Sequence, residues 1–298
     1  MDEEQLSRGE AGPEREAISP ARRFAVPGLA ALAAGLVAGS RSARAAGRLE
    51  EQLTASSAIA EVKRRGRLRI GISTFVPWAM RDKAGKLIGY EVDVANLAAS
   101  DLGVKLELVQ TAWDGIIPAL LAGKFDAIIS GMSITPPRNL TVNFSRPYEH
   151  SGSQIVANRK LAAGVKTLAD FNHAGMVLTC RRGVLGCSYL AKHVPKAKLL
   201  QFDTDNEALQ EVLNGRAAGW IASEPAPSFA ALQHAKTLFV PLKEDVLRSD
   251  EAVAIRKGDV DSLNWFDNWI TYRTTDGTLA ARYHYWFKTR DWAAEVGQ

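Results

Sequence analysis

Arg138 follows two prolines at the exit of an apolar run and stands near small polar residues. The stretch GMSITPPRN (131–139) comes directly after FDAIISG (125–131), whose apolar character predicts a buried strand. Prolines cannot continue a strand ladder, and Gly131 permits a close backbone approach. The hydroxyl of Ser133 and the planar guanidinium of Arg138 suit a carboxylate. The alternative is a surface arginine that caps a loop.

Two cysteines are the other residues with evident chemistry. Cys180 and Cys187 are spaced for a short disulfide, but two buried free thiols are equally compatible with the sequence. No histidine pair lies near them at ligand spacing, so no metal site is expected. The five histidines are scattered, and neither a P-loop nor a dinucleotide fingerprint occurs. We therefore expect no cofactor and no catalytic residue.

The N-terminus has the pattern of an export signal. Arg22 and Arg23 precede the apolar stretch FAVPGLAALAAGLVAG, and an A-x-A cleavage pattern follows at Ala43 and Ala45. This predicts a signal peptide over 1–45, cleaved near Ala45/Ala46, and a periplasmic mature protein. The paired arginines leave both twin-arginine and general secretory export open.

The composition is that of a globular protein, with 46% apolar and 23% charged residues and a net charge of +4. The basic run KRRGRLRI (63–70) leads into an apolar strand, which favours a solvated helix end over a nucleic-acid patch. We expect no nucleic-acid partner, and no segment after the signal peptide resembles a membrane span.

The elements that would position these residues alternate between strand and helix. Strands are expected at 68–73, 104–110 and 125–131, and helices at 91–103 and 113–123, with a hairpin turn at 82–86. A second series has strands at 175–180, 197–203 and 216–223 and helices at 183–193, 204–215 and 227–235. A return strand at 251–259 precedes two helices, broken at Gly277, whose aromatic residues are expected to pack in the core.

One module occurs twice. PALLAGKFDAIISGM (118–132) and QEVLNGRAAGWIASE (210–224) both consist of a helix, a glycine stop, a basic residue and a buried strand. The repetition predicts two similar α/β lobes. Ligands bind such folds at loops that leave the carboxyl ends of strands, so GMSITPPRN is expected at the mouth of a cleft.

These residues resemble the polar amino-acid family of periplasmic solute-binding proteins of ABC importers. The resemblance rests on GKLIGYEVDVANLAASDLGVKLELV, WDGIIPALLAGKFDAIISGMSITPPR, VNFSRPY, TDNEALQEVLNG, AIRKGD and DGTLAARYHYWF, and covers about 67–290. It implies a type II periplasmic-binding-protein fold, with two α/β lobes joined by two hinge strands. By this resemblance, 46–66 is an N-terminal segment, lobe 1 consists of 67–152 and 253–298, and lobe 2 consists of 158–247. The chain is expected to cross between the lobes near SGSQIVAN and RSDEAV.

The resemblance also implies a ligand site. Arg138 would hold an α-carboxylate and Asp205 an α-ammonium, with the hydroxyl and backbone of Ser133 adding contacts. The main chain at Ser130 and Gly131 would meet the same groups. Aromatic and cationic contacts to the ligand side chain are implied at Phe75, Trp113 and Arg181.

Each assignment has a structural alternative. Asp205 fits a helix cap or first turn, Trp113 a helix staple, Phe75 ordinary core and Arg181 the surface. The chain also departs from the family pattern. Val184 replaces a hydroxyl residue, GISTFVPW is one residue short without the acidic residue of some members, and Ala218 replaces an aspartate.

The implied function is capture of an amino acid, polar or charged, for ABC permease subunits in the inner membrane, by a monomer that is not an enzyme. A cyclohexadienyl or arogenate dehydratase-like enzyme is the alternative, since such enzymes share the fold. It would need a proton donor near the second-lobe glycine loop, and no carboxylate occurs between Asp170 and Asp203. A third reading, the sensor domain of a receptor, would need a transmembrane segment that the sequence does not show, which leaves a soluble subunit that feeds a sensor.

Overall fold

The computed structural model describes residues 57–296. The predicted signal peptide, 1–45, lies outside the described residues, as do 46–56 of the N-terminal segment and 297–298. Among the described helices, none combines the length and the apolar character that crossing a bilayer requires.

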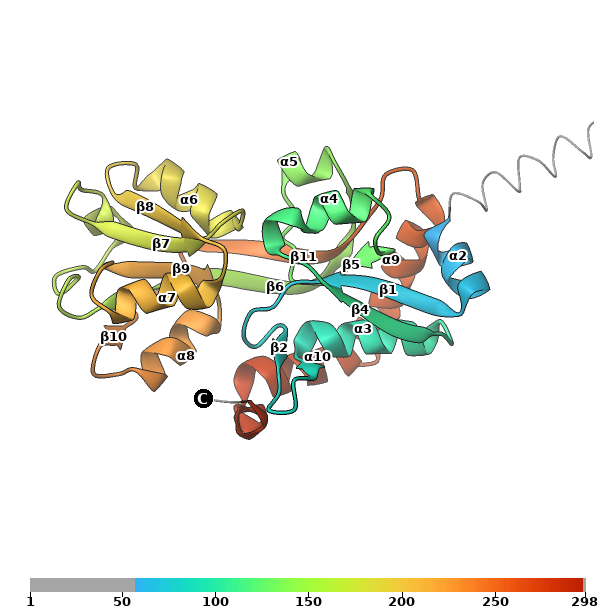
Figure 1. Ribbon diagram of the computed structural model, residues 1–298. Coiled ribbons are helices and arrows are strands. Elements are labelled where there is room, and N and C mark those ends of the chain that lie inside the picture. The colour runs from blue at the N-terminus through green and yellow to red at the C-terminus, as the bar shows by residue number, and fades with distance from the viewer. Residues whose placement is uncertain (1–56, 297–298) are drawn as a thin grey trace, which may run out of the picture. The chain divides into compact units, whose positions relative to one another are not determined.

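Two long antiparallel strands form the centre of a sheet that has nine strands within residues 57–296. β6 (Asn143–Asn158) and β11 (Leu247–Ile255) run side by side through the middle of Figure 1. The other strands are β1 (Arg67–Ile72), β2 (Met80–Arg81), β3 (Leu87–Ile88), β4 (Lys105–Gln110), β5 (Ala127–Ile128), β7 (Val177–Arg181), β8 (Lys198–Phe202), β9 (Gly219–Ser223) and β10 (Leu238–Phe239). The strand order is β4-β1-β5-β11-β6-β9-β7-β8, with β10 on β6 and a separate β2–β3 hairpin.

Helices cover this sheet. They are α2 (Ala58–Arg65), α3 (Tyr90–Asp101), α4 (Ile116–Leu121), α5 (Pro136–Asn139), α6 (Leu185–His193), α7 (Asp205–Leu213), α8 (Ala226–Gln233), α9 (Val260–Thr275) and α10 (Thr278–Tyr283). Short turns of helix are η1 (Trp113–Gly115), η2 (Leu168–Phe171), η3 (His284–Lys288) and η4 (Asp291–Glu295). In Figure 1, α4 and α6 lie on the upper side of the strands, and α3, α7 and α8 on the lower side.

The two halves of the sheet repeat one arrangement, which confirms the predicted pair of similar α/β lobes. β1 lies parallel to both β4 and β5, and β7 lies parallel to both β8 and β9. β5 then pairs antiparallel with β11, as β9 does with β6. The repeated module ends its helix at Gly123 in one lobe and at Gly215 in the other, each with φ of 71°. Two lobes are thus joined by two hinge strands.

Most predicted elements are present, with two local differences. The strand expected at 125–131 is paired only over Ala127–Ile128, with β1 on one side and β11 on the other. The residues after it do not form an irregular loop. Pro136 and Pro137 begin the one-turn helix α5, and the hydroxyl of Thr135 caps it by accepting from the Arg138 backbone N–H.

Each lobe has a core on both faces of its sheet. In lobe 1, one cluster packs β1 against α3 and α9 around Tyr90, and a second packs α4 around Phe125. In lobe 2, one cluster packs α6 around Leu190, and another packs α7 and α8 around Trp220. The C-terminal aromatic residues belong to the first cluster, as predicted, except for the exposed Tyr272.

The hinge strands are hydrogen-bonded to each other where they cross between the lobes. Leu247 pairs with Ser153 and Glu251 with Glu149, and the register then shifts on either side of Ala252. Both predicted crossings, 151–158 and 248–253, fall within β6 and β11. We propose 67–152 with 253–298 as lobe 1 and 158–247 as lobe 2.

Candidate ligand-binding cleft

The candidate site is built from segments that leave the carboxyl ends of strands in both lobes. Phe75 follows β1, Trp113 follows β4 and Gly131 follows β5, while Arg181 ends β7 and Asp205 follows β8. Because β1, β5 and β4 are parallel, as are β7, β8 and β9, their ends meet at one edge in each lobe. Six of the eight sequence-predicted residues line one cavity between the lobes, and Arg138 and Ser130 do not line it.

A cavity of about 30 Å³ lies at this meeting point. It is lined by Phe75, Trp113, Gly131, Ser133, Ser153, Arg181, Val184, Leu185, Gly186, Asp205, Ala222 and Ser223. A larger cavity of about 460 Å³ adjoins it and shares Phe75, Asp205 and Ala222. The smaller one has room for little more than water, so an amino acid can occupy it only if the lobes or Arg181 move.

Arg181 is buried, with 3% of its surface exposed, so the alternative of a surface residue is wrong. Its guanidinium carbon lies 5.0 Å from the ring centroid of Phe75 and 4.9 Å from that of Trp113. Its Nη1 donates to the backbone oxygen of Thr74 at 3.1 Å. The side chain thus crosses from lobe 2 and lies between two aromatic rings of lobe 1.

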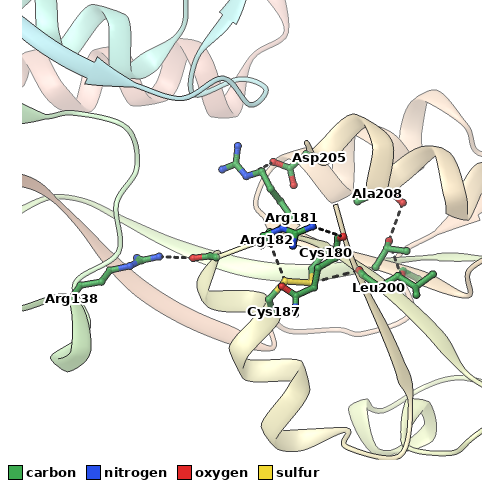
Figure 2. The surroundings of a disulfide bond; sticks show 12 residues. Arg138, Cys180, Arg181, Arg182, Cys187, Leu200, Asp205 and Ala208 are labelled. Atoms are coloured by element: carbon green, nitrogen blue, oxygen red, sulfur yellow. Dashed lines mark hydrogen bonds and ion pairs between the residues drawn. A yellow bond between two sulfur atoms is a disulfide. The ribbon is translucent and has the colours of Figure 1, made fainter. Parts of the chain in front are cut away.

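Asp205 is the counter-charge of Arg181. Its Oδ2 lies 3.3 Å from Arg181 Nε, and its side chain is 15% exposed (Figure 2). Burial raises the pKa of the Asp205 carboxyl, and the nearby positive charge of Arg181 opposes this shift. The helix α7 is capped by Thr204 and Glu207, so the interpretation of Asp205 as the N-cap is wrong, whereas the alternative of an acidic residue in the first turn of this helix is confirmed.

Arg138 also crosses between the lobes, in the opposite direction. Its Nη1 donates to Ser133 O at 2.9 Å, and its Nη2 donates to Gly183 O of lobe 2 at 3.0 Å. Figure 2 shows Arg138 pointing toward the second lobe. Its guanidinium carbon lies 5.5 Å from the Trp113 ring centroid. Burial lowers the pKa of the Arg138 guanidinium, as expected for a cation withdrawn from water.

The backbone after β5 approaches the aromatic residues closely. Gly131 has φ of 59°, and a Cβ there would lie 3.0 Å from the Phe75 ring and 3.2 Å from Trp78. Its N–H donates to Tyr148 Oη at 3.2 Å. Ser130 is fully buried, and its Oγ accepts from Ser73 N at 2.9 Å, which places it behind the cavity wall. Any ligand contact of Ser130 stays a prediction.

Ser133 lines the cavity, but its hydroxyl is directed to Ser249 Oγ at 3.3 Å and to Glu251, a residue that sequence reasoning missed. Glu251 Oε1 accepts from Ser249 at 2.6 Å and from Ser151 at 2.7 Å, and lies 3.4 Å from Ser133 Oγ. Burial raises its pKa to about 7. A carboxylate inside the predicted hinge segment RSDEAV was the available signal.

The raised pKa of Glu251 predicts a pH-dependent stability. Between pH 4.5 and 7 the folded protein holds a proton that the unfolded chain has lost, so stability falls as pH rises through this range. Glu251→Gln should remove that contribution, which amounts to about 3 kcal/mol for a shift of this size. Urea unfolding of both proteins at several pH values measures the difference in slope.

Exposed Glu244 provides the control for that measurement. Glu244→Gln should run parallel to the wild-type stability curve from pH 4.5 to 8. Parallel curves for Glu251→Gln as well would contradict the assignment.

Cys180 and Cys187 form a disulfide, which resolves the two alternatives left by the sequence. Their Cα atoms are 5.6 Å apart, within the usual range for a bridge. The closed loop contains Arg181 and Gly183, two second-lobe residues that bond to lobe 1 across the cleft. The bridge therefore holds these two interlobe contacts on one short loop (Figure 2). Outside this loop, Trp78 Nε1 of lobe 1 also donates to Glu224 O of lobe 2 at 3.3 Å.

Replacing both cysteines with alanine should lower the free energy of unfolding by about 2 kcal/mol, because a short cross-linked loop constrains the unfolded chain. Ligand affinity should fall too, because the loop that contains Arg181 and Gly183 is no longer restrained by the disulfide. Urea unfolding and calorimetric titration measure the two effects against oxidised wild-type protein, and reduced wild-type protein should behave as the variant does. Two titratable thiols in unfolded, unreduced protein would contradict the bridge.

Comparison with known proteins agrees with this architecture. Residues 68–289 match the model of the bacterial extracellular solute-binding proteins, family 3, and the chain belongs to that family. It is 30% identical over 228 residues to the L-cystine-binding protein TcyJ of Escherichia coli strain K12, covering 76% of this chain and 85% of that protein.

Two solved structures are similar in fold and sequence. A putative ABC transporter binding component from Wolinella succinogenes, complexed with lysine, is 39% identical, with a TM-score of 0.73 over 77% of this chain and 99% of that one. The ancestral amino acid-binding protein AncCDT-1, a precursor of cyclohexadienyl dehydratase, is 38% identical, with a TM-score of 0.71 over 78% and 99%.

Proposed function

We propose that this protein is an extracytoplasmic solute-binding protein that captures an amino acid between its lobes and delivers it to the permease of an ABC importer. One observation carries the proposal. Charged groups from both lobes, Arg138 on one side and Arg181 with Asp205 on the other, meet at one cleft. Relatives named for binding cystine and lysine support an amino acid as the ligand class.

The proposed mechanism is a shift between open and closed lobes. The α-carboxylate of the ligand binds Arg138 of lobe 1, and the α-ammonium binds Asp205 of lobe 2. A ligand that makes both contacts binds the closed arrangement better than the open one, so it shifts the population toward closure. The permease then recognises the closed protein.

Binding without catalysis is the better-supported reading of this site. A dehydratase of this fold would need a proton donor beside the second-lobe loop, and residues 181–187 contain no carboxylic acid. The relative AncCDT-1 is itself named as an amino acid-binding protein, although it is a precursor of a dehydratase. We propose that this chain works as a monomer that binds and releases its ligand unchanged.

A thermal-shift screen of the purified protein against the twenty amino acids and several sugars tests the function. A ligand at a hundred times its dissociation constant should add about 2.7 kcal/mol to the stability of the protein. At least one amino acid should raise the melting temperature in a concentration-dependent way. A response to sugars alone, or to nothing in the set, would overturn the proposal.

The proposed periplasmic location depends on cleavage of residues 1–45. Intact mass or N-terminal sequencing of exported protein should show a start at Ala46 or within a few residues of it, because the A-x-A pattern ends at Ala45. A mature chain that retains Phe24 to Val37 would contradict this prediction.

A further inference from the structure

The guanidinium of Arg181 is surrounded by four groups that attract cations. Its carbon lies 5.0 Å from the ring centroid of Phe75 and 4.9 Å from that of Trp113. Its Nη1 donates to Thr74 O at 3.1 Å. Its Nε lies 3.3 Å from Asp205 Oδ2 (Figure 2). An aromatic face attracts a cation more strongly when water is excluded, and a carboxylate supplies the counter-charge. These four groups form a cation site, which the protein fills with its own arginine.

Most of this cation site belongs to the lobe opposite Arg181. Thr74 and Phe75 follow β1 and Trp113 follows β4, all in lobe 1. Arg181 ends β7 of lobe 2, and only Asp205 comes from the same lobe. None of the four groups is adjacent to Arg181 in the sequence. A free cation of similar shape would therefore meet the same two rings, the same carbonyl and the same carboxylate.

Arg181 holds this place against free cations because it is part of the chain. The residue is 3% exposed, and the disulfide between Cys180 and Cys187 restrains the loop that contains it. A tethered group competes with an effective concentration on the order of millimolar. An amino acid at micromolar concentration therefore cannot displace Arg181 by making the same contacts.

The adjoining cavity of about 460 Å³ gives a basic side chain no compensating charge. It shares Phe75 and Asp205 with the smaller cavity, so the side chain of a ligand held at the cleft extends into it. Of the described residues that line it, Asp205 is the one acid and Arg81 is the one base. Asp205 is already paired with Arg181. A basic ligand side chain would thus bring a third positive charge to a single carboxylate.

We propose that Arg181 determines the specificity of the cleft, because its guanidinium fills the cation site and thereby excludes amino acids with a basic side chain. The inference rests on the proposed function and specifies the ligand class for the same site. The α-carboxylate and the α-ammonium of the ligand bind as proposed above. Its side chain carries no basic group and extends into the adjoining cavity, while Arg181 stays in place.

Thermal melting with a small guanidinium compound tests the cation site without any amino acid. Arg181→Ala leaves the two rings, the Thr74 carbonyl and the Asp205 carboxylate around an unfilled space. Ethylguanidinium at ten times its dissociation constant should raise the melting temperature of this variant by about 3 °C or more, and neutral ethylurea should not. Wild-type protein should show no rise with either compound, because Arg181 fills the site.

Calorimetric titration with L-arginine and L-lysine tests the exclusion. Each affinity is expressed relative to that of the best ligand from the thermal-shift screen, so that a general loss of binding cancels. For at least one of the two basic amino acids, this relative affinity should be about tenfold or more higher in Arg181→Ala than in wild type. The basic side chain then enters the site that Arg181 has left.

Two further variants serve as controls. Arg182→Ala removes a neighbouring arginine whose side chain is 53% exposed, and it should keep the wild-type relative affinities. Arg181→Lys keeps a cation between the two rings, so its relative affinities should stay within about threefold of wild type. Circular dichroism and a melting curve establish that each variant is folded.

The outcomes separate the inference from the proposed function. Wild-type protein that binds L-arginine or L-lysine more tightly than any other of the twenty amino acids overturns the inference and leaves the proposed function standing. Folded Arg181→Ala without a gain for either basic amino acid also overturns it. If this variant does not fold, the wild-type ranking decides alone.

The two experiments fail independently. Binding of none of the twenty amino acids, by wild type or variant, overturns the proposed function and the inference with it. No thermal response of folded Arg181→Ala to ethylguanidinium refutes the cation site, whether or not the proposed function holds.

Discussion

Arg138→Ala should weaken amino-acid binding by about two to three orders of magnitude. Removing one partner of a desolvated charge pair costs about 3–5 kcal/mol, and the proposed partner of Arg138 is the ligand α-carboxylate. Arg138→Lys should lose less, because an ammonium keeps the charge but not the two-pronged geometry. Calorimetric titration with the best ligand from the screen measures both variants.

The control for this comparison is Arg182→Ala, which removes an exposed arginine beside the same cleft. It should bind within about twofold of wild type. Arg138→Ala should remain folded, since its side chain bonds to Ser133 O and Gly183 O at the cleft and fills no core. If its affinity stays within threefold of normal, Arg138 is a loop cap and the ligand site lies elsewhere.

Asp205→Ala should weaken binding by a similar factor and should also prevent closure. The variant removes the proposed acceptor of the α-ammonium and leaves Arg181 buried without its counter-charge. Small-angle scattering with ligand present should show a larger radius of gyration than for wild type, because the ligand no longer bridges the lobes. Titration measures the loss of affinity in the same samples.

Asp203→Ala is the matched control, since Asp203 lies two residues earlier with a 78% exposed side chain. It should bind and close as the wild-type protein does. Closure of Asp205→Ala at normal ligand concentrations would show that the second lobe uses another group for the ligand.

The fold was predictable because its signals are local and repeated. Apolar runs at strand length, glycine stops such as Gly123 and Gly215, and the duplicated helix–strand module all lie within short stretches of sequence. The strand at 125–131 was overestimated because an apolar run shows burial, whereas pairing depends on neighbours from β1 and β11. Buried residues that do not pair in a strand form the same kind of apolar run as buried residues that do.

The position of most candidate residues was predictable, but their contacts were not. Phe75, Trp113 and Asp205 line one cavity, whereas Arg138 and Ser130 do not, and the ligand contacts of all of them stay predictions. The ion pair between Arg181 and Asp205 depends on how β7 and β8 place their ends, which no spacing encodes. Glu251 was not predicted because two of its three hydroxyl partners, Ser133 and Ser151, lie at least 100 residues away in the sequence.

The interlobe hydrogen bonds were also hidden from sequence reasoning. Arg138 donates to a backbone oxygen of Gly183, and Arg181 to one of Thr74. Backbone acceptors exist at every position and have no residue signature, so the sequence shows the donor but not its partner.

The register shifts around Ala252 have a mechanical consequence. Up to Glu251 the two hinge strands are paired residue for residue, which prevents one from sliding along the other. Beyond it the ladder is irregular, and bulged strands bend and twist more readily than regular ones. The axis of any rotation between the lobes would then lie beside Glu251. A small rotation of lobe 2 about this axis would displace the residues farthest from Glu251 the most.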